Sequence, residues 1–259
     1  MKLFCTSRYI APLAFLSILT CGFSARASGI VSGNATIDIV GMDSIGHTMS
    51  GEFLIPIEGG VFSAQHLTTS TALWDGAVDN ASGNADPFVN LAFGVTNIAA
   101  VPVEFTVSIA VPIVPIPGAT VHGGSTGGSV SDSNNNGVGG LSTIISVPGT
   151  PFYSGQIDGV GVLSIYPDPT SFPAGGVFAF AGQTVNIPAL NPGLPGPTLP
   201  SGPALLTIGI SHRFLLAPGD SMSASSFFIV QPIPEPSSLM LATFGFVALG
   251  AWRWCRRTR

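Results

Sequence analysis

Short segments of alternating or β-branched residues fill the middle of the chain, between residues 28 and 231. In Val103–Val111, apolar and polar residues alternate strictly as far as Ile109, which gives a strand one buried and one solvent-facing side. Other segments rich in β-branched and aromatic residues also predict strands: Ala35–Val40, Val61–Leu67, Phe88–Thr96, Leu141–Val147, Val160–Tyr166, Val177–Ala181, Leu205–Leu216 and Ser223–Val230. No long stretch of this region has the 3.6-residue period of a helix.

Clusters of Gly, Pro, Asn and Asp separate these segments. They predict turns and loops, among them Asp79–Gly83 and Asn191–Gly202. About ten short strands at this spacing favour an all-β fold, an antiparallel β-sandwich of the jelly-roll or immunoglobulin-like kind, over a closed barrel. No period of about 20–50 residues recurs, which argues against a solenoid or a propeller.

Composition and charge narrow the class further. The 259 residues are 46% hydrophobic and 8% charged, with 33 Gly and 22 Pro, so the chain can bury a core and is rich in turns. Between Arg26 and Arg253, Arg213 is the only cation against thirteen acidic residues, a net charge of −12. Such a surface repels phosphate backbones and excludes nucleic acid as a partner. It also argues against electrostatic docking on an anionic leaflet.

Cysteines lie only near the two ends, as Cys5, Cys21 and Cys255. The middle of the chain therefore offers no disulfide, no cysteine metal site and no cysteine nucleophile.

The first 27 residues have the three parts of a secretory signal peptide. A positive start precedes the uncharged apolar stretch Tyr9–Phe23. Small residues then occupy the −3 and −1 positions, as Ala25 and Ala27, and Ser28 becomes the new N-terminus after signal peptidase cleaves. A buried N-terminal helix and lipoprotein processing at Cys21 are less favoured, the second because Ile18–Thr20 lacks the small residues such processing needs.

A second apolar run, Ser237–Trp252, lies close to the C-terminus. Its 16 residues would span ~24 Å as a helix, a little short of the ~30 Å hydrocarbon core. Trp252 and Trp254 suit an interfacial anchor, and the basic tail follows at once: Arg253, Arg256, Arg257 and Arg259. By the positive-inside rule this tail stays in the cytoplasm and the preceding domain lies outside. We therefore predict a transmembrane helix over residues 237–254, with a buried helix of the domain as the alternative.

Pro234-Glu235-Pro236 stands just before this run and blocks both helix and sheet, because each proline lacks an N–H and restricts the residue before it. The motif, the apolar span and the arginine cluster, in this order, resemble the PEP-CTERM sorting signal of exopolysaccharide-producing Gram-negative bacteria. The resemblance covers about the last 28 residues and implies processing by an exosortase, a membrane-embedded transpeptidase that cleaves near the motif.

Two motifs in the middle have a formal match to known chemistry. Gly123–Gly127 fits the Gly-x-Ser-x-Gly pattern of a nucleophile elbow, but the run of Gly, Ser and Asn that follows cannot form the required helix, so we interpret it as a flexible loop. Asp132, Asn134 and Asn136 fit the first half of a calcium loop. The twelfth position is Thr143 instead of an acid, so a polar surface loop is the favoured interpretation.

The remaining candidates carry less information. The histidines are scattered and form no known metal-binding motif: His47, His66, His122 and His212. The sequence predicts no resident metal and no cofactor.

Carboxylate pairs for glycoside chemistry are available in Glu52 with Glu58 and in Asp75 with Asp79, without a pattern that selects either. Trp74 suits core packing better than stacking on a sugar ring.

Together these observations predict three regions: a signal peptide at 1–27, a secreted β-sandwich at 28–231 and a sorting signal at 232–259. The expected function is a non-enzymatic cell-surface or matrix protein, anchored transiently in the inner membrane, with exopolysaccharide as a candidate partner. A secreted carbohydrate-binding module or a carbohydrate-active hydrolase with the same signal is the alternative.

Overall fold

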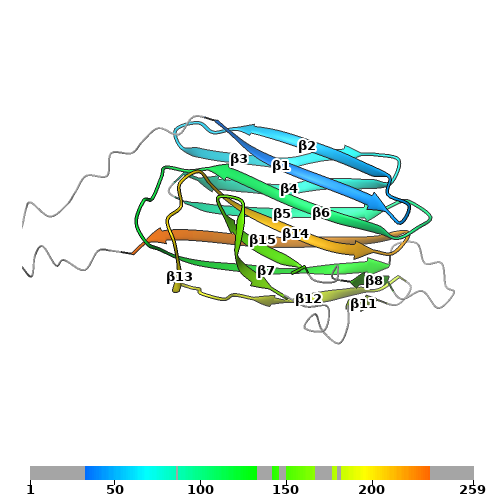
Figure 1. Cartoon of the computed structure of the whole chain (residues 1–259). Coiled ribbons are helices and arrows are strands. Elements are labelled where there is room, and N and C mark those ends of the chain that lie inside the picture. Colours follow the sequence, from blue (N-terminus) through cyan, green and yellow to red (C-terminus); the bar gives the residue numbers. More distant parts are fainter. Residues whose placement is uncertain are drawn as a thin grey trace, which may run out of the picture. The chain divides into compact units, whose positions relative to one another are not determined.

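The computed structural model describes residues 33–85, 87–132, 142–145, 150–166, 177–179 and 182–233. Within these ranges every regular element is a β-strand, and two antiparallel sheets face each other across a hydrophobic core (Figure 1). The predicted all-β sandwich is confirmed. The predicted signal peptide, Pro234–Pro236 and the C-terminal span lie outside the described residues, and none of the described residues forms a helix that could cross a membrane.

The first sheet has six strands in a continuous order. From one edge to the other they are β10 (Val160–Ile165), β9 (Tyr153–Ile157), β14 (Thr207–Leu216), β6 (Val103–Pro112), β1 (Asn34–Asp43) and β2 (Thr48–Pro56). Two short strands extend it beside β14, namely β8 (Ser142–Ile145) and β11 (Val177–Ala179). The outer pairs β10–β9 and β1–β2 are consecutive in the chain, whereas the central pairs, such as β14 with β6, join strands that are distant in sequence.

The second sheet packs against the first and has β15 near its centre. Its order is β12 (Thr184–Leu190), β7 (Thr120–Asp132), β15 (Asp220–Pro232), β5 (Phe88–Asn97), β4 (Trp74–Asn84) and β3 (Val61–Ser70), and β13 (Leu199–Ser201) pairs with β7. A Pro-Gly turn, with Gly219 at φ +77°, carries the chain from β14 in one sheet to β15 in the other.

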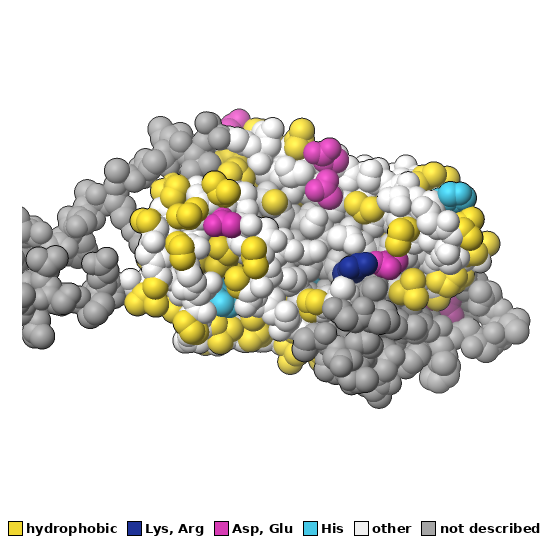
Figure 2. Space-filling view, in the orientation of Figure 1, with side chains coloured by type: hydrophobic (Ala, Val, Ile, Leu, Met, Phe, Trp, Pro, Cys, Tyr) yellow, Lys and Arg dark blue, Asp and Glu magenta, His cyan; other side chains and the backbone are white. Residues whose placement is uncertain are grey.

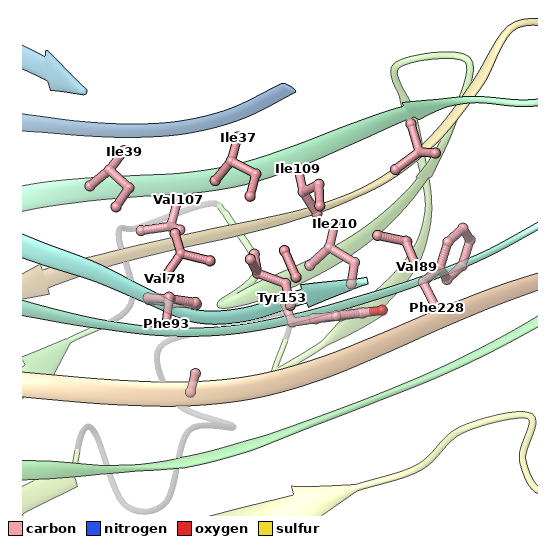
Figure 3. Packing of buried hydrophobic residues seen from close by; sticks show 14 of the residues in the cluster. Ile37, Ile39, Val78, Val89, Phe93, Val107, Ile109, Tyr153, Ile210 and Phe228 are labelled. Atoms are coloured by element: carbon pink, nitrogen blue, oxygen red, sulfur yellow. The ribbon is translucent and has the colours of Figure 1, made fainter. Parts of the chain in front are cut away.

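Alternate residues of the central strands fill the space between the sheets. Figure 3 shows Ile37 and Ile39 of the first sheet pointing toward Val78 and Phe93 of the second. Aromatic rings continue this contact, because Phe214 of β14 stacks on Phe93 with ring centroids 6.4 Å apart. The strict alternation in the sequence of β6 therefore correctly predicted which of its residues face the core.

Trp74 belongs to this core. Its side chain is 0% exposed, and its ring meets the edge of Phe105 at a centroid distance of 6.2 Å. The interpretation of Trp74 as a core residue is confirmed.

Two stretches predicted as turns or loops contain strand. Asp79–Gly83 lies inside β4, where a register shift between Val78 and Asn80 lets a polar segment continue the ladder with Ala81 buried. Asn191–Gly202 contains β13. In the β4 segment, small and polar residues meet the pattern of alternate burial without supplying the large side chains on which the prediction depended.

The prediction of a flexible loop at Gly123–Gly127 is wrong, because these residues form the middle of β7, paired with β15. Close approach on both sides explains the glycines. A Cβ on Gly124 would lie 2.7 Å from the Tyr153 hydroxyl, and one on Gly123 would lie 2.5 Å from the Gly193 carbonyl oxygen. Real Cβ atoms do not come this close, so only glycine fits at these positions.

We expect Gly124→Ala to lower the free energy of unfolding by about 1–3 kcal/mol, because the added methyl group overpacks the contact with Tyr153. Denaturant unfolding followed by circular dichroism measures this. Gly118→Ala is the matched control, since no atom lies within 4 Å of its Cβ, and it should change stability by less than about 0.5 kcal/mol. Equal stability of the two variants would contradict this account of β7.

Candidate functional site

An open groove crosses the outer face of the second sheet and has a volume of about 580 Å³. It runs over five neighbouring strands: β3, β4, β5, β15 and β7. Most of its polar lining consists of hydroxyl side chains, so we call it the hydroxyl groove; these residues are Thr68, Thr69, Ser70, Thr96, Ser129, Ser131, Ser221 and Ser223.

Small residues make this part of the sheet hollow. Ala77 and Gly94 lie at neighbouring register positions on β4 and β5 and form part of the lining. A Cβ built on Gly94 meets no atom nearer than the Met222 carbonyl oxygen at 3.8 Å, so a larger side chain there would enter the groove. The outward residues of β7 and β15 are serines on both strands, which keeps the floor low.

Hydrogen bonds hold several of these hydroxyls in place. Ser129 and Ser223 share a bond of 3.0 Å across β7 and β15, and Ser131 bonds Thr184 of β12 at 2.6 Å. Ser70 donates to the carboxylate of Asp75, the one ionisable side chain in the lining. Hydroxyls both donate and accept, so this surface suits a neutral ligand that carries many hydroxyl groups.

A single carboxylate limits what the groove can do chemically. Hydrolysis of a glycosidic bond ordinarily needs two carboxyl groups about 5–10 Å apart on either side of the bond. Asp79 also belongs to β4, but it is an exposed residue at the bulge and does not line the groove. The structure therefore does not bring Asp75 and Asp79 together in one site.

In the other suggested carboxylate pair, Glu52 with Glu58, the structure pairs Glu52 with Asp38 instead. Glu52 lies on β2 directly opposite Asp38 of β1, whereas Glu58 bridges to Val61 in the connection to β3. Partial burial, together with the nearby charge of Glu52, raises the pKa of Asp38. This pair depends on the β1–β2 register, which the sequence pattern did not specify.

A serine and a histidine meet inside the sandwich, at a place that sequence reasoning missed. His212 Nε2 lies 2.7 Å from Ser226 Oγ, which in turn lies 2.9 Å from Thr126 Oγ1. His212 is 0% exposed and Ser226 2% exposed, and the rings of Phe93 and Phe152 lie about 5 Å from the imidazole. The alternation of inward and outward residues along each strand is the sequence signal that could have located this pair, because His212 and Ser226 occupy inward positions of β14 and β15.

This pair cannot act as a nucleophile and its base. Burial lowers the pKa of His212 to about 3, so the ring is a weak base. No substrate reaches a serine enclosed between two sheets, and the contact instead joins β14 of the first sheet to β15 of the second.

The other candidate ligands do not converge. His122 is buried, and burial lowers its pKa, whereas His47 and His66 are exposed on β-hairpin and edge positions. In the described ranges no three His, Cys, Asp or Glu side chains come close enough to hold a metal ion. Asp132 is 4% exposed at the end of β7, opposite Asp220 of β15, and the other candidate calcium ligands, Asn134 and Asn136, lie outside the described residues.

Beyond the hydroxyl groove, the last described strand leads into a second functional region. β15 ends at Pro232. Residues 232–257 match the PEP-CTERM protein-sorting motif. This match confirms the resemblance inferred from Pro234, Glu235 and Pro236, and indicates an exported protein that exosortase processes through a membrane-anchored intermediate. Among curated proteins, none matches the chain.

We expect the buried imidazole to make stability depend on pH. Unfolded His212 binds a proton near pH 6.5, whereas the folded chain resists protonation down to about pH 3. In that interval the unfolded state binds more protons, so this residue lowers stability by about 1.4 kcal/mol for each unit that the pH falls. Urea unfolding of the wild type and His212→Gln, between these pH values, isolates this contribution from that of the carboxylates.

The variant should show the smaller loss of stability on acidification. His66→Gln serves as the control, because the His66 side chain is exposed on β3, and its pH dependence should follow the wild type. Identical slopes for the wild type and His212→Gln would show that His212 is not the buried neutral group described above.

Proposed function

We propose that the chain is a non-enzymatic protein of the cell surface or extracellular matrix, of structural or interaction type, made by an exopolysaccharide-producing Gram-negative bacterium. The observation that carries the proposal is the direct continuation of β15 into the sorting motif at Pro232. Because β15 pairs with both β7 and β5, the folded sandwich is the part that exosortase would deliver. Its buried Ser226–His212 pair and its groove with one carboxylate support binding over catalysis.

Processing would follow the order of the signals along the chain. Signal peptidase would cleave between Ala27 and Ser28 during export. The apolar run Ser237–Trp252 would then hold the protein in the inner membrane until exosortase acts near the Pro-Glu-Pro motif. Release or transfer would leave the sandwich at the surface or in the matrix.

We expect mature protein from the surface fraction to lack the C-terminal apolar run, because exosortase removes it. Mass spectrometry of that fraction checks this, and a peptide that extends to Arg259 would contradict the proposal.

Changing Pro234, Glu235 and Pro236 together to alanine should retain the protein in the inner membrane. The matched control is Pro115→Ala with Pro117→Ala, two exposed prolines outside the motif, which should leave surface yield unchanged.

A carbohydrate-binding role is the second candidate, and the hydroxyl groove favours it. Four of the five strands, β3, β5, β7 and β15, place hydroxyl groups around a hollow floor, and the lining has no cation that would select an anionic ligand. Since hydroxyls bond other hydroxyls in both directions, a neutral polysaccharide chain fits this chemistry. The exopolysaccharide of the producing cell would be its natural ligand.

We expect Gly94→Leu to reduce binding to purified exopolysaccharide several-fold, because the new side chain fills the groove without a clash in the sheet. Co-sedimentation of the protein with the polysaccharide measures this. Ala110→Leu adds the same kind of side chain to an exposed position of β6 in the other sheet and should bind as the wild type does. Equal binding by wild type and Gly94→Leu would exclude the hydroxyl groove as the site.

A further inference from the structure

We propose that one end of the sandwich rests on the membrane: exposed hydrophobic side chains beside the end of β15 enter the interfacial layer of the bilayer while the C-terminal segment anchors the chain. We call these side chains the apolar tip and define it as Val160, Leu205, Leu206 and Ile233. The inference rests on the membrane-anchored intermediate of the proposed function and concerns a surface to which the sorting motif itself assigns no role.

The side chains of the apolar tip are well exposed to solvent. Leu206 is 69% exposed, Val160 65%, Leu205 44% and Ile233 39%. Figure 2 shows many hydrophobic side chains at this end of the molecule, which is the end toward which the β15 arrow points in Figure 1, and others at the opposite end. Exposed hydrophobic groups that cluster at one place mark a surface that meets another apolar phase.

Hydrogen bonds hold the two leucines beside the β9–β10 turn. The carboxylate of Asp158 accepts the backbone N–H groups of Leu205, Leu206 and Thr207 at 2.9, 2.7 and 2.9 Å. The N–H of Asp158 returns a bond of 2.8 Å to the Thr207 carbonyl oxygen. Asp158 therefore fixes the loop at residues 202–206 next to Val160, so the backbone that carries the two leucines is held in a defined position.

The same end carries the last described residue of the chain. The N–H of Ile233 donates to the Ala119 carbonyl oxygen at 3.0 Å, and the hydroxyl of the next residue, Thr120, donates to Gly202 at 2.7 Å. Gly202 begins the loop that contains Leu205 and Leu206. Ile233 thus leaves the sandwich beside the other members of the apolar tip.

The length of the tether places this end near the bilayer. Only Pro234, Glu235 and Pro236 separate Ile233 from Ser237, where the apolar run begins. However these residues are arranged, four Cα steps reach at most about 15 Å. The polar layer on each side of the hydrocarbon core is itself roughly 5–8 Å thick. While the run is inserted, Ile233 therefore stays within about 15 Å of its first residue, which brings this end of the sandwich close to that layer.

The distribution of charge indicates that burial of hydrophobic side chains, and not electrostatic attraction to lipid headgroups, would hold the apolar tip at the bilayer. Arg213, the one cation of residues 33–233, is 2.6 Å from Glu104 on the outer face of the first sheet. Asp158 has its carboxylate bonded by three N–H groups, which lowers its pKa although burial opposes this shift. Glu58 lies at the connection of the opposite sheet edges, β2 and β3, and can remain in water. Contact should therefore need neither anionic lipid nor low salt.

The opposite end of the sandwich supplies a matched control. Ile45, in the β1–β2 turn, is 76% exposed, comparable with Leu206. Strands of about ten residues separate the two ends by roughly 30 Å. A label at Ile45 should therefore remain in water when the apolar tip touches lipid.

The test uses the full chain, with Cys5, Cys21 and Cys255 changed to serine, in phosphatidylcholine vesicles. Leu206→Cys and Ile45→Cys each carry the same fluorophore, and nitroxide-bearing phosphatidylcholine acts as the quencher. We expect quenching at position 206 to exceed that at position 45 several-fold and to be unchanged by added salt or by anionic lipid. In a chain labelled at Val160→Cys, Leu205→Ser with Leu206→Ser should lower quenching, with thermal unfolding confirming that this variant folds.

Each alternative has its own outcome. Flotation of the vesicles first reports whether the chain inserts; a chain that fails to float contradicts the membrane-anchored intermediate itself. A chain that floats but shows equal, weak quenching at both labels overturns only the docking of the apolar tip. Quenching that needs anionic lipid also overturns it. A change in the fluorescence of the label at position 206 that appears only when two chains share a vesicle, and without quenching by the nitroxide lipid, would assign this surface to a second copy of the chain.

Discussion

The structure depends on a hydrophobic interior that the two sheets share and that several polar side chains of the described strands cross. Each of these side chains joins one sheet to the other by a hydrogen bond: Trp74 Nε1 to Met49, Asn97 Nδ2 to Leu216, His212 with Ser226, and the Tyr153 hydroxyl to Phe227. An unbonded polar group in such a place costs roughly 1–3 kcal/mol, so these bonds select one alignment of the sheets from many that would bury the same apolar area. Hydrophobic burial brings the sheets together, and the crossing bonds fix how they meet.

This constraint also decides where function can lie. The serine–histidine contact between Ser226 and His212 is among the crossing bonds, closed off by Phe93 and Phe152. Burial favours the neutral form of the His212 ring, so a charged imidazole at this position would destabilise the core. The outer faces and the ends of the sandwich remain for recognition, and these are where small hydroxyl residues and exposed leucines are found.

The sequence predicted those features that a contiguous stretch encodes. β6 and β14 were recognisable because their large apolar residues alternate, and the sorting motif was recognisable because its parts follow one another in the chain. β7 was not, since the reason for Gly124 is the hydroxyl of Tyr153, which comes from the other sheet. The hydroxyl groove was not predictable either, because β3, β4, β5, β7 and β15 each supply only a few of its residues and their register was unknown.

The placement of the groove relative to the sorting motif gives the two ends different roles. Ser221, which lines the groove, lies near the start of β15, and the motif begins at Pro232, where the same strand ends. Eleven residues of extended chain separate them by roughly 35 Å. A chain anchored beyond Pro232 would therefore hold the groove toward the end of the sandwich that is farther from the membrane. Binding at the groove and processing at the motif would then not obstruct each other, so the protein could engage a ligand before or after exosortase cuts it free.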